Sequence, residues 1–201
     1  MVIIVNSFLQ QNSMMLKINS KAPDFNVKAY YEDNIKKFTL KDYKGKWLIL
    51  LFYPADFTFV CPTELGEFAD RYKELKTLNT EVASISTDTP YVHKAWHDDS
   101  NTIKKIKYPM FSDPSGRMCK DYGTYIEEEG LSVRATFIID PDCVIKAYDI
   151  HDNSIGRSAD EIIRKLKALQ FVRKNGEQVC PANWAPGKET LKPSLDLVGK
   201  I

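Results

Sequence analysis

The sequence predicts an α/β protein in which a mixed central sheet is flanked by helices. Three observations support this expectation: an apolar run at residues 47–53, an alternation of strand and helix patterns after it, and a strand hairpin followed by a last helix. The alternation places helices against a sheet, and the hairpin adds antiparallel pairing to it. A chain of 201 residues has room for one compact domain with short extensions.

The first strand and the first helix have the clearest patterns. Residues 47–53 read Trp-Leu-Ile-Leu-Leu-Phe-Tyr and end at Pro54, which is typical of a strand buried on both faces. A loop follows, and after Cys61 apolar residues recur at steps of three and four, which predicts an amphipathic helix. The apolar positions of this helix are Leu65, Phe68, Ala69, Tyr72 and Leu75.

The middle of the chain continues the alternation. Residues 81–86 are apolar enough for a second strand, 91–97 look like the start of a helix, and 116–122 predict a short helix. Residues 135–139 and 144–148 predict two strands of a hairpin, because the turn sequence Asp-Pro-Asp-Cys separates them.

The two ends of the chain differ from this pattern. Residues 158–171 predict the last amphipathic helix, with Ser158 as its N-cap and Glu161 three residues later. Glycine and proline interrupt residues 175–201, which we therefore expect to form an irregular arm. Residues 1–14 are expected to be a disordered tail or an extension upstream of a start at Met14 or Met15.

Composition and charge argue against several classes of function. Lys and Arg total 28 against 27 Asp and Glu, so the chain has no basic excess for a nucleic acid or an anionic membrane. The apolar start of the chain is too short for a signal peptide or a membrane span. We therefore expect a cytoplasmic protein without a nucleic-acid or membrane partner.

The cysteines and histidines are too scattered for a dithiol motif or a metal site. The sequence contains no Cys-x-x-Cys, and its three histidines are too few and too spread to complete a metal site. We expect free or catalytic thiols, no metal and no cofactor. These residues are Cys61, Cys119, Cys143, Cys180, His93, His97 and His151.

Cys61 has the setting of a reactive thiol. Pro62 suits the first position of the predicted helix and Glu64 the third, which places Cys61 at the N-cap. There the sulfur would face free backbone N–H groups and the positive end of the helix dipole, both of which favour a thiolate. A small buried core residue is the ordinary alternative for a single cysteine after an apolar strand.

The surrounding residues resemble a known family. Residues 54–65 read Pro-Ala-Asp-Phe-Thr-Phe-Val-Cys-Pro-Thr-Glu-Leu and match the Pro-x-x-x-Thr-x-x-Cys motif of the peroxiredoxins. The resemblance covers residues 15–201 and includes 134–140 and 179–184. Residues 193–201 resemble the bacterial alkyl hydroperoxide reductase C branch of the typical two-cysteine peroxiredoxins.

The resemblance implies a thioredoxin-like fold with an N-terminal extension and a peroxidase domain over residues 15–174. It assigns Cys61 as the peroxidatic cysteine, whose thiolate attacks a hydroperoxide and becomes a sulfenic acid. Thr58 corresponds to the hydroxyl that binds the sulfur and the peroxide, Pro54 to the residue that shields the pocket, and Arg134 to the guanidinium beside the thiolate.

Further roles follow from the same resemblance. Glu64 and Arg157 fit an ion-pair network that aims Arg134. Cys180, in the arm of residues 175–201, corresponds to the resolving cysteine, which attacks the sulfenic acid of a partner subunit. The resemblance thus implies a homodimer, which in this family commonly forms decamers, and recycling by thioredoxin or a flavoprotein disulfide reductase.

Structural alternatives remain for these residues. Thr58 could be a turn hydroxyl, Arg134 a solvated residue before a strand, and Glu64 and Arg157 helix-capping residues. Among the other candidates, we interpret Cys119 as buried in a short helix and Cys143 as an exposed thiol in a turn. We interpret His93, Trp96 and His97, at helical spacing, as packing residues.

Two other functions also remain open. The chain could be an oligomeric scaffold that acts as a holdase chaperone or a redox relay, although a scaffold does not need Pro54, Thr58, Cys61 and Arg134 together. It could also be a thiol–disulfide oxidoreductase on the same fold, although it lacks Cys-x-x-Cys.

Overall fold

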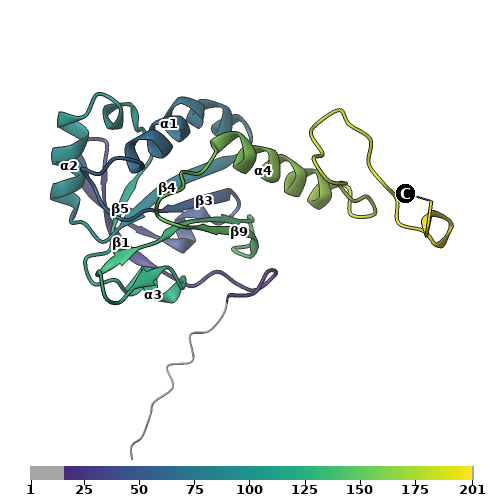
Figure 1. The fold of residues 1–201 in the computed structure, drawn as a ribbon, viewed down its shortest axis with the longest axis horizontal. Coiled ribbons are helices and arrows are strands. Elements are labelled where there is room, and N and C mark those ends of the chain that lie inside the picture. Colours follow the sequence, from purple (N-terminus) through teal and green to yellow (C-terminus); the bar gives the residue numbers. More distant parts are fainter. Residues whose placement is uncertain (1–15, 201) are drawn as a thin grey trace, which may run out of the picture.

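A seven-stranded mixed sheet forms the centre of the computed structural model, which describes residues 16–200 (Figure 1). The strand order is β2-β1-β5-β4-β3-β8-β9, in which β4 pairs in parallel with β3 and β5 and the other pairs are antiparallel. The expectation for residues 1–14 lies outside the described residues. The strands are β1 (Asn26–Tyr31), β2 (Asn34–Thr39), β3 (Trp47–Phe52), β4 (Thr80–Ser86), β5 (Met110–Ser112), β8 (Arg134–Ile139) and β9 (Ile145–His151).

The central strand β3 separates two apolar cores. Every residue of β3 is buried, as the apolar run predicts. Ile49 and Leu51 pack into the core on one face, whereas Leu48 and Leu50 pack into the core on the other. Successive side chains of a strand point to opposite faces, so a continuous apolar run is needed to fill both cores.

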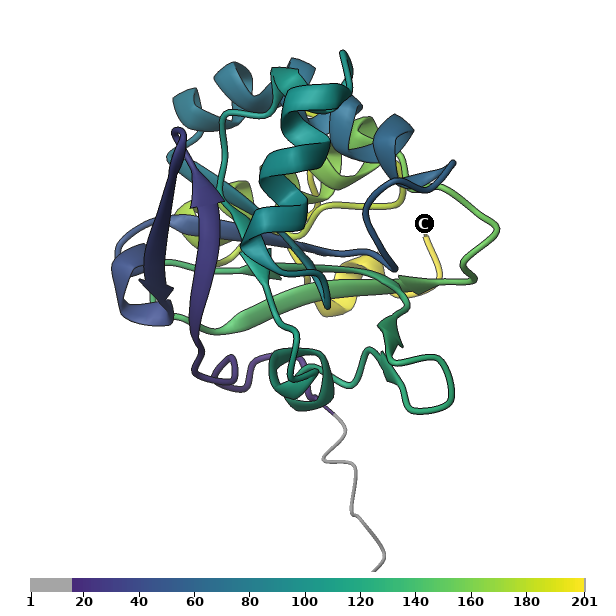
Figure 2. The ribbon, with the colours of Figure 1, turned by 90° about the vertical axis from the view of Figure 1, so that its left-hand side faces the viewer.

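Helices cover both faces of this sheet (Figure 2). The helices α1 (Cys61–Thr77), α2 (Pro90–Asp99) and α4 (Ala159–Lys174) contribute to the core that contains Ile49, and the short helix α3 (Arg117–Asp121) contributes to the core that contains Leu50. The expectation of a mixed sheet flanked by helices is therefore confirmed. Short 3₁₀ helices occupy Leu40–Tyr43, Ile103–Lys105 and Leu195–Leu197.

Most of the predicted elements are present at the predicted places. The strand pattern at 81–86 corresponds to β4, and the predicted hairpin corresponds to β8 and β9, which pair antiparallel. The helix predicted at 158–171 extends three residues further, and its N-cap is confirmed because the Ser158 hydroxyl accepts the Glu161 backbone N–H.

Three strands of the sheet have no counterpart among the predicted elements. β1 and β2 form a hairpin whose turn residues, Glu32 and Asp33, have φ angles of 51° and 56°. Glycine and asparagine are the usual signals for such a turn, so Glu32 and Asp33 do not mark a turn clearly in the sequence. The third strand, β5, has only three residues. A separate small hairpin pairs β6 (Tyr125–Ile126) with β7 (Leu131–Ser132).

After α4 the chain continues as an extended segment that leaves the main body (Figure 1). Val179 and Leu191 form an isolated bridge within this segment. Trp184 is buried against α4, where its ring packs on that of Phe171 at a centroid distance of 4.9 Å. Between residues 16 and 200, none of the helices is long and apolar enough to cross a membrane.

The packing of β3 predicts a large effect of truncating one of its side chains. Leu50 is 0% exposed, so Leu50→Ala should lower the free energy of unfolding by about 2–5 kcal/mol. The matched control is Leu195→Ala, because Leu195 is 91% exposed and its loss should change stability by less than about 0.5 kcal/mol. Urea unfolding of the full chain measures both. Equal effects of the two changes would contradict this account of the core.

Candidate active site

The loop between β3 and α1 carries the predicted motif to the edge of the sheet. Pro54 is buried two residues after the end of β3, and the Thr58 hydroxyl donates to the Ala55 carbonyl oxygen at 2.9 Å. Phe57 has a φ of 55°, a conformation that is unfavourable for a bulky residue. The loop therefore holds a strained shape immediately before Cys61.

The predicted position of Cys61 in its helix is wrong by one residue. The helix begins at Cys61 itself, and Val60 is the N-cap with a helical backbone conformation. The Val60 carbonyl oxygen accepts the N–H groups of Thr63 and Glu64 at 3.0 and 3.3 Å, while Pro62 has no N–H to offer. These backbone donors are therefore used within the helix rather than at the sulfur.

A side chain takes the place of the backbone donors. Arg134 is the first residue of β8, and because β8 runs antiparallel to β3, it lies beside the end of β3 where the loop starts. Its Nη1 atom donates to the Cys61 sulfur at 3.3 Å and to Glu64 Oε2 at 2.7 Å. The backbone carbonyl of Asn153 accepts from Arg134 Nε at 2.9 Å, and the Asn153 side chain accepts from the Arg134 backbone N–H, so Asn153 holds both the guanidinium and the backbone of Arg134.

Glu64 joins this arginine to a second one. Arg157 donates to Glu64 Oε1 from both its backbone N–H, at 2.8 Å, and its Nε atom, at 2.7 Å. The side chains of Glu64 and Arg157 are each 1% exposed, and that of Arg134 is 4% exposed. The structure thus brings together four of the predicted site residues: Cys61, Glu64, Arg134 and Arg157.

The positive and negative charges of this buried cluster are unequal in number. Burial by itself would raise the pKa of the Glu64 carboxyl, but the hydrogen bonds and charge of Arg157, with the charge of Arg134, hold that pKa below its ordinary value. The cluster then contains two positive charges and one negative charge. A negative charge on the Cys61 sulfur would balance it, and charged hydrogen bonds of this kind are stronger than neutral ones.

Thr58 lies on the same loop as Pro54, and its hydroxyl makes a different hydrogen bond from the one predicted. The hydroxyl proton of Thr58 is directed at the Ala55 carbonyl oxygen, so the Thr58 oxygen is left with lone pairs that can accept another hydrogen bond. Within residues 16–200, the Thr58 hydroxyl does not form a hydrogen bond with the Cys61 sulfur. Cys61 itself is 0% exposed beneath this loop.

The structure places Cys180 in the segment after α4, where its thiol lies against that helix and apart from Cys61. Its thiol lies 3.9 Å from the Ala168 carbonyl oxygen and lines a cleft of about 280 Å³ that also contains Arg164. Burial raises the pKa of the Cys180 thiol, while the positive charge of Arg164 acts in the opposite direction. Within the part of the chain that the structure describes, both cysteines are free thiols, and Cys61 does not line this cleft.

The other two cysteines differ in burial. Cys119 is buried, as expected, and burial together with the charge of Asp113 raises the pKa of its thiol to about 12. Cys143 is half-buried in the turn between β8 and β9, and burial also raises the pKa of its thiol. Neither thiol has the arginine neighbour that Cys61 has among the described hydrogen bonds.

Two residues near the site were missed by the sequence interpretation. Asn153 holds Arg134, and nothing in its local sequence distinguishes it from an ordinary loop residue. His93 was expected to be a packing residue, but it bonds Asp56 of the Cys61 loop. A buried imidazole needs polar partners, so its position on the apolar face of a helix was a usable signal.

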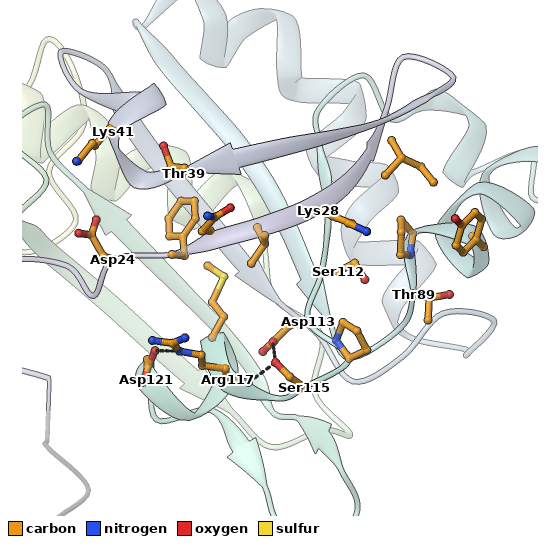
Figure 3. A pocket seen from close by; sticks show the side chains of 18 residues that line it. Asp24, Lys28, Thr39, Lys41, Thr89, Ser112, Asp113, Ser115, Arg117 and Asp121 are labelled. Carbon is orange, nitrogen blue, oxygen red and sulfur yellow. Dashed lines mark hydrogen bonds and ion pairs between the residues drawn. The ribbon is translucent and has the colours of Figure 1, made fainter.

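A larger cavity lies elsewhere, between β1 and the segment that leads into α3 (Figure 3). It has a volume of about 670 Å³, and none of the predicted site residues lines it. Its charged lining residues are three acids and three bases, so the cavity has no net charge that would select an ionic ligand. These residues are Asp24, Asp113, Asp121, Lys28, Lys41 and Arg117.

Comparisons with known proteins agree with the geometry. Residues 18–148 match the AhpC/TSA family, and residues 168–200 match the C-terminal domain of 1-Cys peroxiredoxin. Alkyl hydroperoxide reductase C of Salmonella typhimurium is 50% identical over 187 residues, which cover 93% of this chain and 100% of the relative.

Two solved structures are similar to this chain. The crystal structure of Enterococcus faecalis AhpC has a TM-score of 0.80 and 50% identity, and the match covers 83% of this chain and 100% of that one. The reduced 2-Cys peroxiredoxin of Plasmodium vivax has a TM-score of 0.85 and 34% identity, with coverages of 89% and 94%. These likenesses confirm the thioredoxin-like fold.

The depressed pKa of Glu64 predicts how stability depends on pH. Its contribution should be complete above the ordinary value of 4.5 and should be lost as the pH falls through the lower value of the folded state. At neutral pH, Glu64→Gln should cost about 3–5 kcal/mol, because it leaves two buried arginines without their anion. The difference between wild type and variant should shrink as the pH falls.

Unfolding by urea at a series of pH values measures this difference. Glu32→Gln is the control, because Glu32 forms an exposed pair with Lys36 and its loss should have little effect. A difference between wild type and Glu64→Gln that is independent of pH would show that the Glu64 charge does not stabilise the fold.

Proposed function

Because this chain belongs to the AhpC/TSA family and is a peroxiredoxin of the alkyl hydroperoxide reductase C branch, we propose that it reduces hydrogen peroxide and organic hydroperoxides through Cys61. The observation that supports the proposal most strongly is the Arg134 guanidinium, 3.3 Å from the Cys61 sulfur within a buried cluster. An arginine held in this way both balances a thiolate and stays charged at any working pH.

The chemistry of the first step uses this arrangement. The Cys61 thiolate attacks the nearer oxygen of the peroxide and forms an S–O bond while the O–O bond breaks. The departing oxygen takes the electron pair and is then protonated by water. Negative charge therefore moves from the sulfur to the departing oxygen, and donors fixed along that path stabilise the transition state. Arg134 supplies such donors from the sulfur side, and the product on Cys61 is a sulfenic acid.

Thr58 and Pro54 complete the site in this proposal. Since the Thr58 hydroxyl proton is used by Ala55, its oxygen is free to accept the O–H of an incoming hydroperoxide. Pro54 is buried at the start of the same loop, lacks an N–H, and shields the pocket from water. Glu64 and Arg157 act as positioning residues, because they hold Arg134 rather than the substrate.

Conversion of the Cys61 sulfenic acid into a disulfide requires a second thiol. We propose that Cys180, in the arm of residues 175–201, attacks the sulfenic acid of a partner subunit, which releases water and forms an intersubunit disulfide. Cys61 is fully buried, so the loop of residues 54–60 has to open before the two sulfur atoms meet. The active protein would then be a homodimer, which can assemble into decamers, and thioredoxin or a flavoprotein disulfide reductase would recycle it in the cytoplasm.

A rapid-mixing experiment tests the assignment of the two cysteines. Reduced wild-type protein should consume hydrogen peroxide quickly and form a dimer-sized disulfide on a non-reducing gel. Cys61→Ser should abolish both, whereas Cys180→Ser should abolish the disulfide and keep the fast first step. If Cys61→Ser consumes peroxide as well as wild type, Cys61 is not the catalytic residue, and the scaffold function takes the place of the enzyme.

The geometry of Arg134 predicts that lysine cannot replace it. The guanidinium bonds Cys61, Glu64 and Asn153 at once, and an ammonium lacks the planar fork that makes these contacts together. Arg134→Lys should lower the rate of Cys61 oxidation by about tenfold or more. Arg173→Lys, in an exposed ion pair, is the control. Equal rates in the two variants would contradict the role given to Arg134.

A further inference from the structure

A second buried network lies on the other side of the loop that covers Cys61. His93, on α2, is 0% exposed, and its Nδ1 atom lies 2.8 Å from Asp56 Oδ2. Its Nε2 atom lies 3.0 Å from the Phe111 carbonyl oxygen. A carbonyl oxygen only accepts, so Nε2 carries a proton, and a second proton is shared between Nδ1 and the Asp56 carboxyl group. With that proton in place, both ring nitrogens are satisfied.

Asp56 is held by further hydrogen bonds. Its Oδ1 atom accepts from the Tyr53 hydroxyl at 2.6 Å, and its backbone N–H donates to Asp88 Oδ2 at 2.8 Å. Asp88 is itself fixed, because Ser86 donates to its carboxylate and Ser112 donates to its carbonyl oxygen. The network therefore ties the loop of residues 54–60 to α2 and to the ends of β4 and β5.

The same helix also holds the strained part of this loop. Phe57 follows Asp56 and has the unfavourable φ of 55°, and its ring packs on that of Trp96 at a centroid distance of 6.0 Å. Trp96 lies one helical turn after His93 on α2. A strained conformation persists only where its surroundings determine it, and here the bonds of Asp56 and the packing of Phe57 supply that constraint.

We propose that His93 and Asp56 are positioning residues that hold the loop of residues 54–60 closed over Cys61 for peroxide reduction. This inference rests on the proposed function, because the loop carries Pro54 and Thr58. Loss of the anchor releases the strained loop, so the closed state that reduces peroxide becomes less populated. The open state, which the meeting of Cys61 with Cys180 requires, becomes more populated.

The key variant is His93→Gln in the full-length, reduced protein. A glutamine amide cannot reach both Asp56 and the Phe111 carbonyl oxygen as the imidazole does. Loss of a buried polar partner should shift the ratio of closed to open protein about tenfold towards the open state, and the second-order rate of Cys61 oxidation by hydrogen peroxide should fall with the closed fraction. The rate of disulfide formation after oxidation should stay the same or rise, so the ratio of the two rates changes.

Two further variants separate positioning from folding. Asp56→Asn is the conservative variant, because the carboxamide can accept from Tyr53 and donate to a neutral His93, and its oxidation rate should lie between those of wild type and His93→Gln. Tyr53→Phe removes one hydrogen bond and should lower the rate about threefold, which provides a test if His93→Gln does not fold.

His97→Gln is the matched control, because His97 lies on the same helix but bonds Tyr30 and Ile106 instead of the loop. It should leave the ratio of the two rates unchanged. If His93→Gln and Tyr53→Phe also leave this ratio at the wild-type value, the positioning role is wrong even though the peroxidase stands. If wild type itself shows no fast oxidation of Cys61, the proposed function fails, and this inference fails with it.

Discussion

The structure around Cys61 depends on one buried carboxylate. Glu64, in the first turn of α1, bonds Arg134 at the start of β8 and Arg157 just before α4, so three separate parts of the chain meet at its two oxygens. The favourable charge interaction is large here because the side chains are almost fully buried. The position of the Arg134 guanidinium, and with it the environment of the sulfur, follows from this contact.

In the proposed mechanism, the loop over Cys61 has to satisfy two opposite requirements. Peroxide reduction is best served by a closed, water-poor site, whereas formation of a disulfide needs the Cys61 sulfur to leave it. The structure places a strained residue, Phe57, between a bonded Asp56 and a bonded Thr58. A loop that is strained but well anchored can be stable when closed and still open without losing much free energy, because opening relieves the strain.

The sequence predicts the parts of this structure whose signals are local. The apolar run of β3 and the turn between β8 and β9 are each contained within a few residues. The β1–β2 hairpin has no glycine at its turn and was not predicted. The ion-pair cluster joins residues 70 and 93 positions apart, so only the family resemblance brought Arg134 and Arg157 to Glu64 in advance. The N-cap was misplaced because the backbone of Val60, not its side-chain type, decides where α1 begins.

The energetics of the cluster bear on which function it serves. Removing charges from water costs free energy. Well-packed apolar residues in the place of a buried ion pair therefore often stabilise a fold as much as the ion pair does. Stability alone therefore does not explain why two arginines and a glutamate are buried beside one sulfur. A scaffold would be served equally well by an apolar core at this place. A reaction that moves negative charge from the Cys61 sulfur to a departing oxygen needs a fixed positive charge there, and Arg134 provides it 3.3 Å away. The proposed peroxidase function thus accounts for the buried charges, which folding alone does not.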